Sequence, residues 1–388
     1  MEINKEQKDN KMIIKVSRKL DTNTAPELEE QVSNFDNIEK LIFDFEDLDY
    51  IASSGLRVLL KCKKQVDDTS IINCNPEVFE IFNITGFSEM MDVKKAFRRI
   101  SIDNCEKIGE GFFGNIYRID PETIVKVYKV PDCLDMITRE RELSKKAFVM
   151  GIPTAIPYDI VKVGEQYGAV FELLNAESTV DIINNDEALD NFAKKCVDVL
   201  KKMHNTKLNN FELPSRREAV KQILNDCKKC LSDETYNKLL YLLDTIPETN
   251  TMLHCDFHVK NLMLQNDELL LIDMDTLSTG HPIFEFASIY ATYIGYSCVD
   301  KHNTDKFLKM PLDTTTKLFY RIFENYYNDK SKEEMEDMIS KISIISYIQI
   351  LNTRAMYSEM GYGTEKEEVE FCVNYLTEKA KTMDSLNY

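Results

Sequence analysis

The chain has 388 residues, of which 43% are hydrophobic and 29% charged, with only 12 glycines and 10 prolines. This composition is typical of globular chains and excludes collagen-like, mucin-like and disordered classes. The length predicts two or three domains. The net charge of −18 argues against a nucleic-acid or membrane partner, because both present anionic surfaces.

No apolar run approaches the ~20 residues that a bilayer-spanning helix needs. The first ten residues are polar and charged, where a signal peptide would carry an apolar segment. The ten cysteines are scattered, and the close pair Cys227 and Cys230 has no second pair with which to build a zinc ribbon. We therefore expect a cytoplasmic protein with reduced thiols.

Short strands and helices alternate between residues 11 and 97, which predicts one small α/β domain. The expected strands are residues 12–16, 41–45 and 70–74, and the expected helices are residues 25–32, a helix from Gly55, and residues 76–82.

The pattern changes near residue 100. Residues 101–174 are rich in strands with one helix, whereas residues 175–388 are mainly helical, with a loop-and-strand region at 253–280. This predicts domains at 1–100 and 101–388, the second divided into lobes at about 174. Residues 1–100 carry a net charge of −4 and the remainder −14.

A glycine-rich segment opens the second domain. Gly109, Gly111 and Gly114 have the spacing that lets a backbone turn lie close over phosphate groups. Strand-like segments follow, where a dinucleotide-binding loop would lead into a helix. The second of these strands contains Lys126, whose ammonium group needs a partner in an apolar strand. Phosphates and a carboxylate of the next helix, Glu140 or Glu142, are the candidate partners.

Two acidic motifs follow in the second half of the chain. The first is His254-Cys-Asp-Phe-His-Val-Lys-Asn261, and the second is Ile272-Asp-Met-Asp275 at the end of an apolar strand. Phosphoryl transfer needs an aspartate to orient the attacking hydroxyl and oxygen ligands to hold Mg²⁺. Asp256, Asn261 and Asp273 are residues of these types.

These motifs, in this order, resemble the aminoglycoside phosphotransferase and choline kinase branch of the protein-kinase-like fold, over residues from about 103 to 388. The resemblance implies a bilobal α+β domain that uses ATP and Mg²⁺. It implies the following roles: Asp256 as catalytic base, Asn261 and Asp273 as Mg²⁺ ligands, Asp275 as an auxiliary metal carboxylate, Lys126 with Glu140 at the phosphates, Gly109, Gly111 and Gly114 in the glycine loop, and the backbone from Glu172 to Leu174 at the adenine. Two departures are Cys255, where the family usually has glycine, and the bulky loop tip Phe112-Phe113.

The acceptor is expected to be a small molecule with a hydroxyl group. Only eight residues separate Asp273 from Pro282, where a protein kinase inserts a long segment that docks a peptide. The acidity of this domain slightly favours a cationic acceptor.

The first domain resembles the STAS domain of anti-sigma factor antagonists over residues 11 to 97. The matching segments are Leu20-Asp-Thr-Asn-Thr-Ala, the run from Leu41 to Leu56 that ends in Ser-Ser-Gly-Leu, and Asn75-Pro-Glu-Val. The resemblance implies a protein partner at this surface and a phosphoacceptor at Ser53, with Ser54 beside it. Ala52 replaces the aspartate that commonly precedes the acceptor, and helix capping is the other interpretation of the serines.

Three functional hypotheses remain open from the sequence. The first is a phosphotransferase for a small-molecule hydroxyl, coupled to a STAS-type regulatory module. The second is a nucleotide-sensing signalling protein whose STAS unit docks a partner. The third is a Ser/Thr kinase that acts on its own STAS domain.

Overall fold

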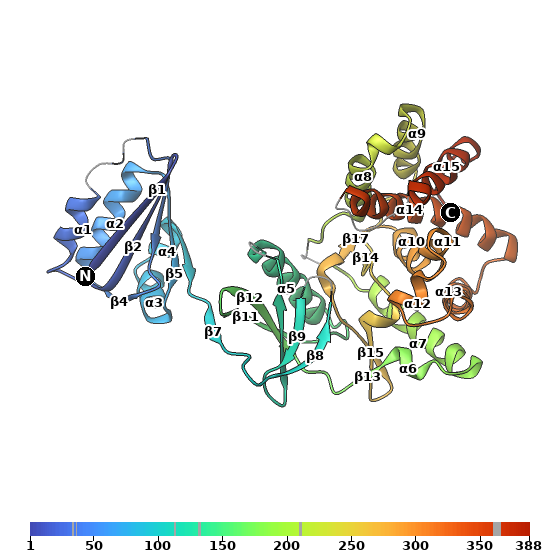
Figure 1. The fold of residues 1–388 in the computed structure, drawn as a ribbon, viewed down its shortest axis with the longest axis horizontal. Coiled ribbons are helices and arrows are strands. Elements are labelled where there is room, and N and C mark those ends of the chain that lie inside the picture. The colour runs from blue at the N-terminus through green and yellow to red at the C-terminus, as the bar shows by residue number, and fades with distance from the viewer. Residues whose placement is uncertain (33–34, 36, 112–113, 131–132, 209–211, 360–365) are drawn as a thin grey trace. The chain divides into compact units, whose positions relative to one another are not determined.

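The structure is a computed structural model that describes residues 1–388 except 33–34, 36, 112–113, 131–132, 209–211 and 360–365. The described chain divides into two compact units (Figure 1). The first consists of residues 1–101 with 161–165, and the second of residues 102–160 with 166–388.

The first unit is built on a sheet with the order β1-β2-β3-β5-β6, and β4 also pairs with β2. The pairings β2–β3, β3–β5, β5–β6 and β2–β4 are parallel, whereas β1–β2 is an antiparallel hairpin. The strands are β1 (Glu2–Lys8), β2 (Lys11–Leu20), β3 (Lys40–Asp44), β4 (Leu48–Ile51), β5 (Asp68–Cys74) and β6 (Asp92–Lys95).

Four helices connect these strands: α1 (Ala25–Gln31), α2 (Ser53–Gln65), α3 (Pro76–Ile84) and α4 (Phe87–Met90). Asn75 caps α3, since its side chain accepts a hydrogen bond from the N–H of Val78 at 2.8 Å. Gly55 lets α2 approach the sheet, because a Cβ at this position would lie 2.6 Å from Cγ of Leu20. The α/β class expected for this domain is confirmed.

The second unit begins with a strand-rich lobe. Its strands β12, β10, β9 and β8 lie side by side in this order, and β11, whose residues 161–163 fall in the first unit, pairs with β12. The short strand β7 (Arg98–Ile100), which belongs to the first unit, pairs in parallel with those residues of β11. The strands β8, β9, β10 and β12 pair antiparallel in turn along this sheet. The elements are β8 (Glu106–Glu110), β9 (Gly114–Arg118), β10 (Thr123–Tyr128), α5 (Leu134–Val149), β11 (Pro157–Val163) and β12 (Gln166–Glu172).

The remainder of the second unit is a helical lobe with two small sheets, one of order β13-β15-β16 and one made of β14 and β17. Its strands are β13 (Glu177–Ser178), β14 (Met252–Leu253), β15 (Leu262–Gln265), β16 (Glu268–Leu271) and β17 (Ser278–Thr279). Its helices are α6 (Thr179–Ile182), α7 (Asp186–His204), α8 (Arg216–Asp226), η1 (Lys228–Cys230), α9 (Asp233–Asp244), η2 (Val259–Asn261), η3 (Met274–Thr276), α10 (Ile283–Tyr290), η4 (Ala291–Gly295), α11 (Tyr296–Val299), α12 (Asn303–Phe307), α13 (Leu312–Tyr326), α14 (Lys332–Glu359) and α15 (Lys366–Thr382).

The helical lobe has a large apolar core to which α7, α10, α13 and α14 contribute. The segment η4 is a π-helical turn between α10 and α11, and it packs closely on α14. A Cβ on Gly295 would lie only 2.6 Å from Cδ1 of Ile350, so a larger residue would displace the end of that isoleucine side chain. The bilobal α+β class expected for the second domain is confirmed. Among the described residues, none of the helices has the length and apolar character that a membrane span requires.

Candidate active site

The glycine-rich segment forms the hairpin between β8 and β9. The N–H of Gly111 donates a hydrogen bond to the carbonyl of Gly114 at 2.8 Å. A Cβ on Gly114 would lie 2.5 Å from the carbonyl oxygen of Val127 on β10, so only glycine fits this close approach. The loop tip, Phe112-Phe113, lies outside the described residues.

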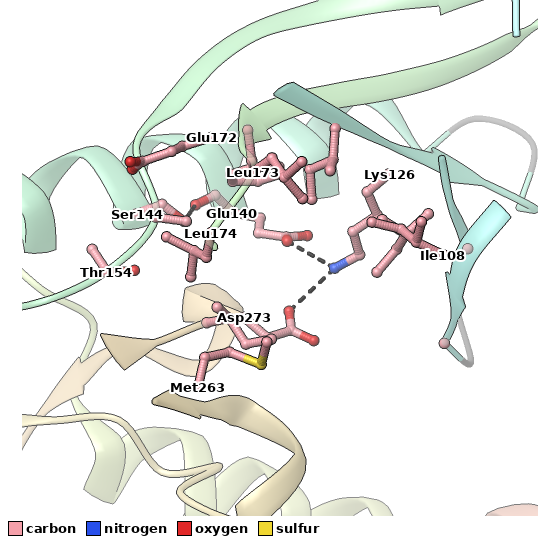
Figure 2. A pocket seen from close by; sticks show the side chains of 17 residues that line it. Ile108, Lys126, Glu140, Ser144, Thr154, Glu172, Leu173, Leu174, Met263 and Asp273 are labelled. Atoms are coloured by element: carbon pink, nitrogen blue, oxygen red, sulfur yellow. Dashed lines mark hydrogen bonds and ion pairs between the residues drawn. The ribbon is translucent and has the colours of Figure 1, made fainter. Parts of the chain in front are cut away.

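Lys126 of β10 lies between two carboxylates. Its Nζ is 2.8 Å from Oε1 of Glu140 on α5 and 3.2 Å from Oδ1 of Asp273 (Figure 2). The other oxygen of Glu140 accepts a hydrogen bond from the hydroxyl of Tyr128 at 2.7 Å. Glu142, the other candidate partner, pairs instead with Arg141 at 3.2 Å and is half exposed. The lysine is therefore fixed between β10, α5 and the segment after β16.

The environment of Lys126 keeps it positively charged. Burial by itself lowers the pKa of Lys126, but the charges of Asp273 and Glu140 outweigh it and raise the pKa above its ordinary value. Only 16% of the lysine side chain and 5% of the Glu140 side chain are exposed, so the pair is shielded from salt. Such a site holds a cation ready for an anionic ligand.

A cavity of about 330 Å³ opens between the two lobes of this unit, directly beside Lys126 (Figure 2). It is lined mostly by apolar side chains, and the charged groups of Lys126, Glu140 and Asp273 meet on one part of its wall. Such a cavity suits a flat ring system linked to an anionic group. The predicted residues on its wall are Gly111, Gly114, Lys126, Glu140, Glu172, Leu174 and Asp273. Gly109, Asp256, Asn261 and Asp275 do not line it.

The hinge segment lines the cavity where the adenine is expected. The N–H of Glu172 donates to the carbonyl of Ile156 at 3.0 Å, and the N–H of Leu173 donates to the carbonyl of Glu122 at 2.7 Å. The carboxylate of Glu172 in turn accepts from the N–H of Ile156 at 3.2 Å. Two of the three hinge N–H groups are thus already paired with protein, which leaves Leu174 as the candidate donor to a base.

The segment from 254 to 261 holds Asp256 against Asn261. The amide Nδ2 of Asn261 donates to Oδ2 of Asp256 at 2.8 Å and to its carbonyl at 3.0 Å. Nε2 of His258 lies 3.3 Å from the other carboxylate oxygen. Burial by itself raises the pKa of Asp256, but the hydrogen bond and charge of His258, with help from His254 and Asn261, lower it overall. The carboxylate is therefore ionised at neutral pH and able to accept a proton.

Glu285 of α10 anchors this segment through its backbone. Its two carboxylate oxygens accept from the N–H of His254 at 2.6 Å and from the N–H of Cys255 at 2.9 Å. The glutamate is fully buried, and His204 lies 3.7 Å from it. From the π-helical turn η4, the hydroxyl of Tyr293 accepts from the N–H of Val259 at 3.0 Å. Two buried side chains, those of Glu285 and Tyr293, thus anchor the segment from 254 to 261.

His254 braces the segment through its ring. Its Nδ1 accepts from the N–H of Asp256 at 3.2 Å, so the ring proton is on Nε2, which faces the carbonyl of Ile272 at 3.2 Å. The next residue, Cys255, has a φ of +62°, in the left-handed region that favours glycine. A residue with a Cβ is strained in this conformation, which accounts for the glycine that the family usually has at this position. The thiol is buried against Ser278.

The proposed metal ligands come from the two ends of the β15–β16 hairpin. The N–H of Ile272 donates to the carbonyl of Asn261 at 3.0 Å, so the backbones of Asn261 and Asp273 are adjacent. Because Nδ2 of Asn261 is taken by Asp256, its Oδ1 is the atom available to a metal. Among the described residues, no group of three or more His, Cys, Asp or Glu side chains is arranged to hold a metal ion.

Asp275 faces a different cavity from Lys126. It lines a second cavity, behind α5, together with Thr276 and Ser278. Burial, with the charges of Asp273 and Glu140, raises the pKa of Asp275 to about 7. Asp275 does not line the cavity beside Lys126.

In the first unit, α2 begins at Ser53, and its N-cap residue is Ala52, with no side-chain cap hydrogen bond. Ser53 is exposed. The hydroxyl oxygen of Ser54 is buried and has no hydrogen-bond partner among the described residues. Neither serine caps the helix, so the capping interpretation finds no support in these contacts.

Three residues of the site were not identified from the sequence: Tyr128, Glu285 and Tyr293. Glu285 carried a usable signal, because it is a single acid within the apolar run Ile283-Phe-Glu-Phe-Ala, and a buried acid needs donors. The two tyrosines lie in apolar segments, where an aromatic residue is ordinarily part of the core.

An antiparallel sheet with a glycine loop and a buried lysine–glutamate pair, above a lobe that carries Asp256 and Asn261, defines a kinase-type phosphotransferase. The family model described as the phosphotransferase enzyme family matches residues 105–300, just over half of the chain, and the chain belongs to this family. Residues 2–100 match the STAS domain model, so both predicted resemblances are confirmed.

Solved structures with the same fold include aminoglycoside phosphotransferases. A thermostable mutant of APH(4)-Ia in apo form has 12% sequence identity and a TM-score of 0.52, over 78% of this chain and 98% of that chain. A ternary complex of this enzyme with ADP and hygromycin B has 12% identity and a TM-score of 0.52, over 72% and 94%. At this identity the likeness shows the fold alone. No curated protein sequence matches the chain.

Proposed function

We propose that the chain transfers the γ-phosphoryl group of ATP to a hydroxyl group of a small molecule. The observation that carries this proposal is Lys126, which is held between Glu140 and Asp273 at the polar end of an otherwise apolar cavity. In this proposal the regulatory domain is 1–100, and the phosphotransferase domain is 101–388, with lobes that meet near residue 174.

The nucleotide occupies the cavity with its base at the hinge and its phosphates at Lys126. Leu174 offers an N–H to the base, and Gly109, Gly111 and Gly114 allow the β8–β9 turn to lie over the phosphates. The bound ADP in the structurally similar APH(4)-Ia complex supports this assignment.

Asn261 and Asp273 are the residues that would hold Mg²⁺. They offer one amide and one carboxylate oxygen, the hard donors that this ion prefers, and the amide oxygen is free because its nitrogen is anchored. When bound, Mg²⁺ supplies positive charge that offsets the negative charge of the phosphates. Asp275, behind α5, acts here as an auxiliary charge rather than as a direct ligand.

Asp256 is the proposed base. The acceptor hydroxyl oxygen forms the new bond to phosphorus, the bond from phosphorus to the β,γ-bridging oxygen breaks, and the hydroxyl proton moves to Asp256. Its carboxylate has the required charge because its pKa is lowered, and Asn261 and His258 hold it in one orientation. Positioning and charge supply most of the catalysis in such reactions.

A small acceptor is supported by the short path between the metal segment and α10. From Asp273 the chain enters η3, β17 and α10 without an inserted docking segment. The net charge of −14 beyond residue 100 favours a cationic acceptor. The hygromycin B in the APH(4)-Ia complex is an example of a small acceptor bound by the same fold.

The test is ATP turnover against a panel of hydroxyl-bearing metabolites, with and without Mg²⁺, for the wild type and Asp256→Ala. We expect turnover with at least one compound and a loss of about 10²- to 10⁴-fold in the variant. If neither protein binds Mg·ATP or turns it over, the enzymatic assignment is wrong and a partner-binding role takes its place.

We infer that the STAS domain is a regulatory module that docks a protein partner, with Ser53 as the phosphoacceptor. Ser53 is exposed at the N-terminus of α2, where free N–H groups and the helix dipole stabilise a phosphate dianion. Partner recovery with Ser53→Asp and Ser53→Ala tests this, because equal recovery would mean that charge at Ser53 is not the switch. Intact mass after incubation with Mg·ATP tests whether the chain phosphorylates itself.

A further inference from the structure

A second cavity, of about 250 Å³, lies behind α5 in the phosphotransferase unit. Its wall is formed by α5, the start of α8 and the segment between η3 and β17, and its polar residues include Arg139, Ser215, Arg216, Asp275 and Ser278. Glu140 lines both this cavity and the nucleotide cavity. A molecule bound here would therefore contact the same residue that positions Lys126.

The basic side chains of this cavity lack ion-pair partners. Among the described residues, neither Arg139 nor Arg216 forms an ion pair or a hydrogen bond, and Nε of Arg216 is buried without a partner. An arginine nitrogen removed from water without a partner is a cost that a bound anion would offset.

The carboxylate of Glu140, next to Arg139 in the sequence and on the wall of this cavity, is not available to the arginines. Both oxygens of Glu140 are already bonded, one to Lys126 and the other to the hydroxyl of Tyr128. Asp275 also lines the cavity, so a ligand must place its anionic group toward the arginines and away from that carboxylate. The hydroxyl group of Ser215, whose oxygen accepts from the N–H of Glu218, adds a neutral donor that suits a phosphate oxygen.

We propose that this cavity binds a small ligand with a phosphate group, held by Arg139 and Arg216. Planar guanidinium groups bind phosphate oxygens in pairs, so two of them suit a dianion better than lysines would. The ligand connects α5 to α8 and thereby stabilises Glu140 at Lys126. Its occupancy strengthens nucleotide binding, a consequence that rests on the function proposed above.

Calorimetric titration with inorganic phosphate and, separately, with glycerol phosphate tests the site directly. The proteins are the full chain, Arg139→Gln, Arg216→Gln, Lys126→Met and the control Lys145→Gln. Lys145 is an exposed lysine of the same helix that does not line the cavity. We expect either arginine substitution to weaken the binding of at least one compound tenfold or more and Lys145→Gln to leave it unchanged. Lys126→Met frees the Glu140 carboxylate on the cavity wall, so we expect it to weaken the binding, but less than either arginine substitution does.

Loss of phosphate binding in Lys126→Met, with retention in both arginine variants, would place the anion in the nucleotide cavity and overturn the proposal. Absence of binding by either compound would overturn it too. Arg139 is exposed, so its substitution is not expected to impair folding, and thermal unfolding checks this. These outcomes do not depend on turnover, so they separate this proposal from the enzymatic one.

The coupling is measured as the affinity for Mg·AMP-PNP with and without phosphate. We expect a several-fold gain in the wild type and none in Arg139→Gln, and by linkage the nucleotide should raise phosphate affinity by the same factor. Equal gains in both proteins would show that the cavity does not act on Glu140.

Discussion

Asn261 donates its side-chain amide to both the carboxylate and the carbonyl of Asp256, at 2.8 and 3.0 Å. This leaves the amide oxygen of Asn261 free, and under the proposed function that oxygen binds Mg²⁺, which would give the residue two roles. Substitution by Asp keeps an oxygen ligand but replaces the donor with a carboxylate that repels Asp256. We expect Asn261→Asp to lower kcat/KM about 100-fold, close to Asn261→Ala. Near wild-type kcat/KM for Asn261→Asp would show that metal ligation alone matters.

The pairing of Lys126 with Glu140 predicts a loss of nucleotide affinity when the carboxylate is removed. Glu140→Gln is expected to raise the Kd for Mg·ATP about tenfold, or ~1.4 kcal/mol, because the lysine loses the partner that fixes it. The matched control is Glu142→Gln, which removes the same charge from the exposed face of α5. Equal affinities for the two variants would contradict a positioning role for Glu140. Isothermal titration measures both.

The positive φ of Cys255 predicts an unusual order of stability. Both Cys255→Ala and Cys255→Gly remove the buried thiol, but only glycine relieves the strained backbone. We expect the glycine variant to exceed the alanine variant by about 1 kcal/mol in the free energy of unfolding, the reverse of the usual order. Denaturant unfolding gives this difference. An alanine variant that is the more stable of the two would mean that the backbone relaxes at no cost.

His281 predicts a loss of stability in mild acid. Burial, with the charges of Arg217 and His204, lowers the pKa of His281 from 6.5 to about 4. Because the unfolded state binds the proton more readily, the contribution of the neutral ring is complete above pH 6.5 and is lost as pH falls toward 4. Nδ1 of His281 accepts from the N–H of Ile283, and His281→Asn keeps an acceptor without titrating.

The measurement is the free energy of unfolding of the wild type minus that of His281→Asn, followed between pH 7 and pH 4. We expect this difference to fall as the pH falls. A difference that stays constant over this range would exclude His281 as the titrating group. The carboxylates of the chain contribute equally to both proteins, so they cancel in this difference.

Much of the architecture follows from local pattern. The strands β2, β3, β5 and β10 and the helices α1, α3 and α5 lie where apolar spacing and caps predict them. The strand β1 was missed, because Glu2–Lys8 is polar apart from Ile3, which is its only partly buried residue, and so has no alternation of apolar and polar positions. It pairs with β2 along its entire length, so its stability comes from that tertiary pairing rather than from its own sequence.

The choice between Glu140 and Glu142 was accessible from the sequence. The buried residues of α5 include Ile137, Glu140, Ser144 and Ala147, a helical spacing of three and four. Glu142 is two positions from Glu140, which turns it to the opposite face. The anchors Glu285 and Tyr293 were less accessible, because they bond to backbone N–H groups of a segment about 30 residues away. The single acid in its apolar run indicates that Glu285 is buried, but no side-chain pattern identifies the backbone groups that it or Tyr293 contacts.

Glu285 holds the segment from 254 to 261 through the peptide N–H groups of residues 254 and 255, not through their side chains. The side chain at position 255 can therefore change while this backbone anchor stays in place, as the cysteine there illustrates, whereas His254 also braces the segment through its ring. Position 285 itself is more constrained. Only glutamate and aspartate offer two carboxylate oxygens as acceptors, and aspartate is one methylene shorter. The position under strongest selection in this part of the domain is thus expected to be one that never touches a substrate.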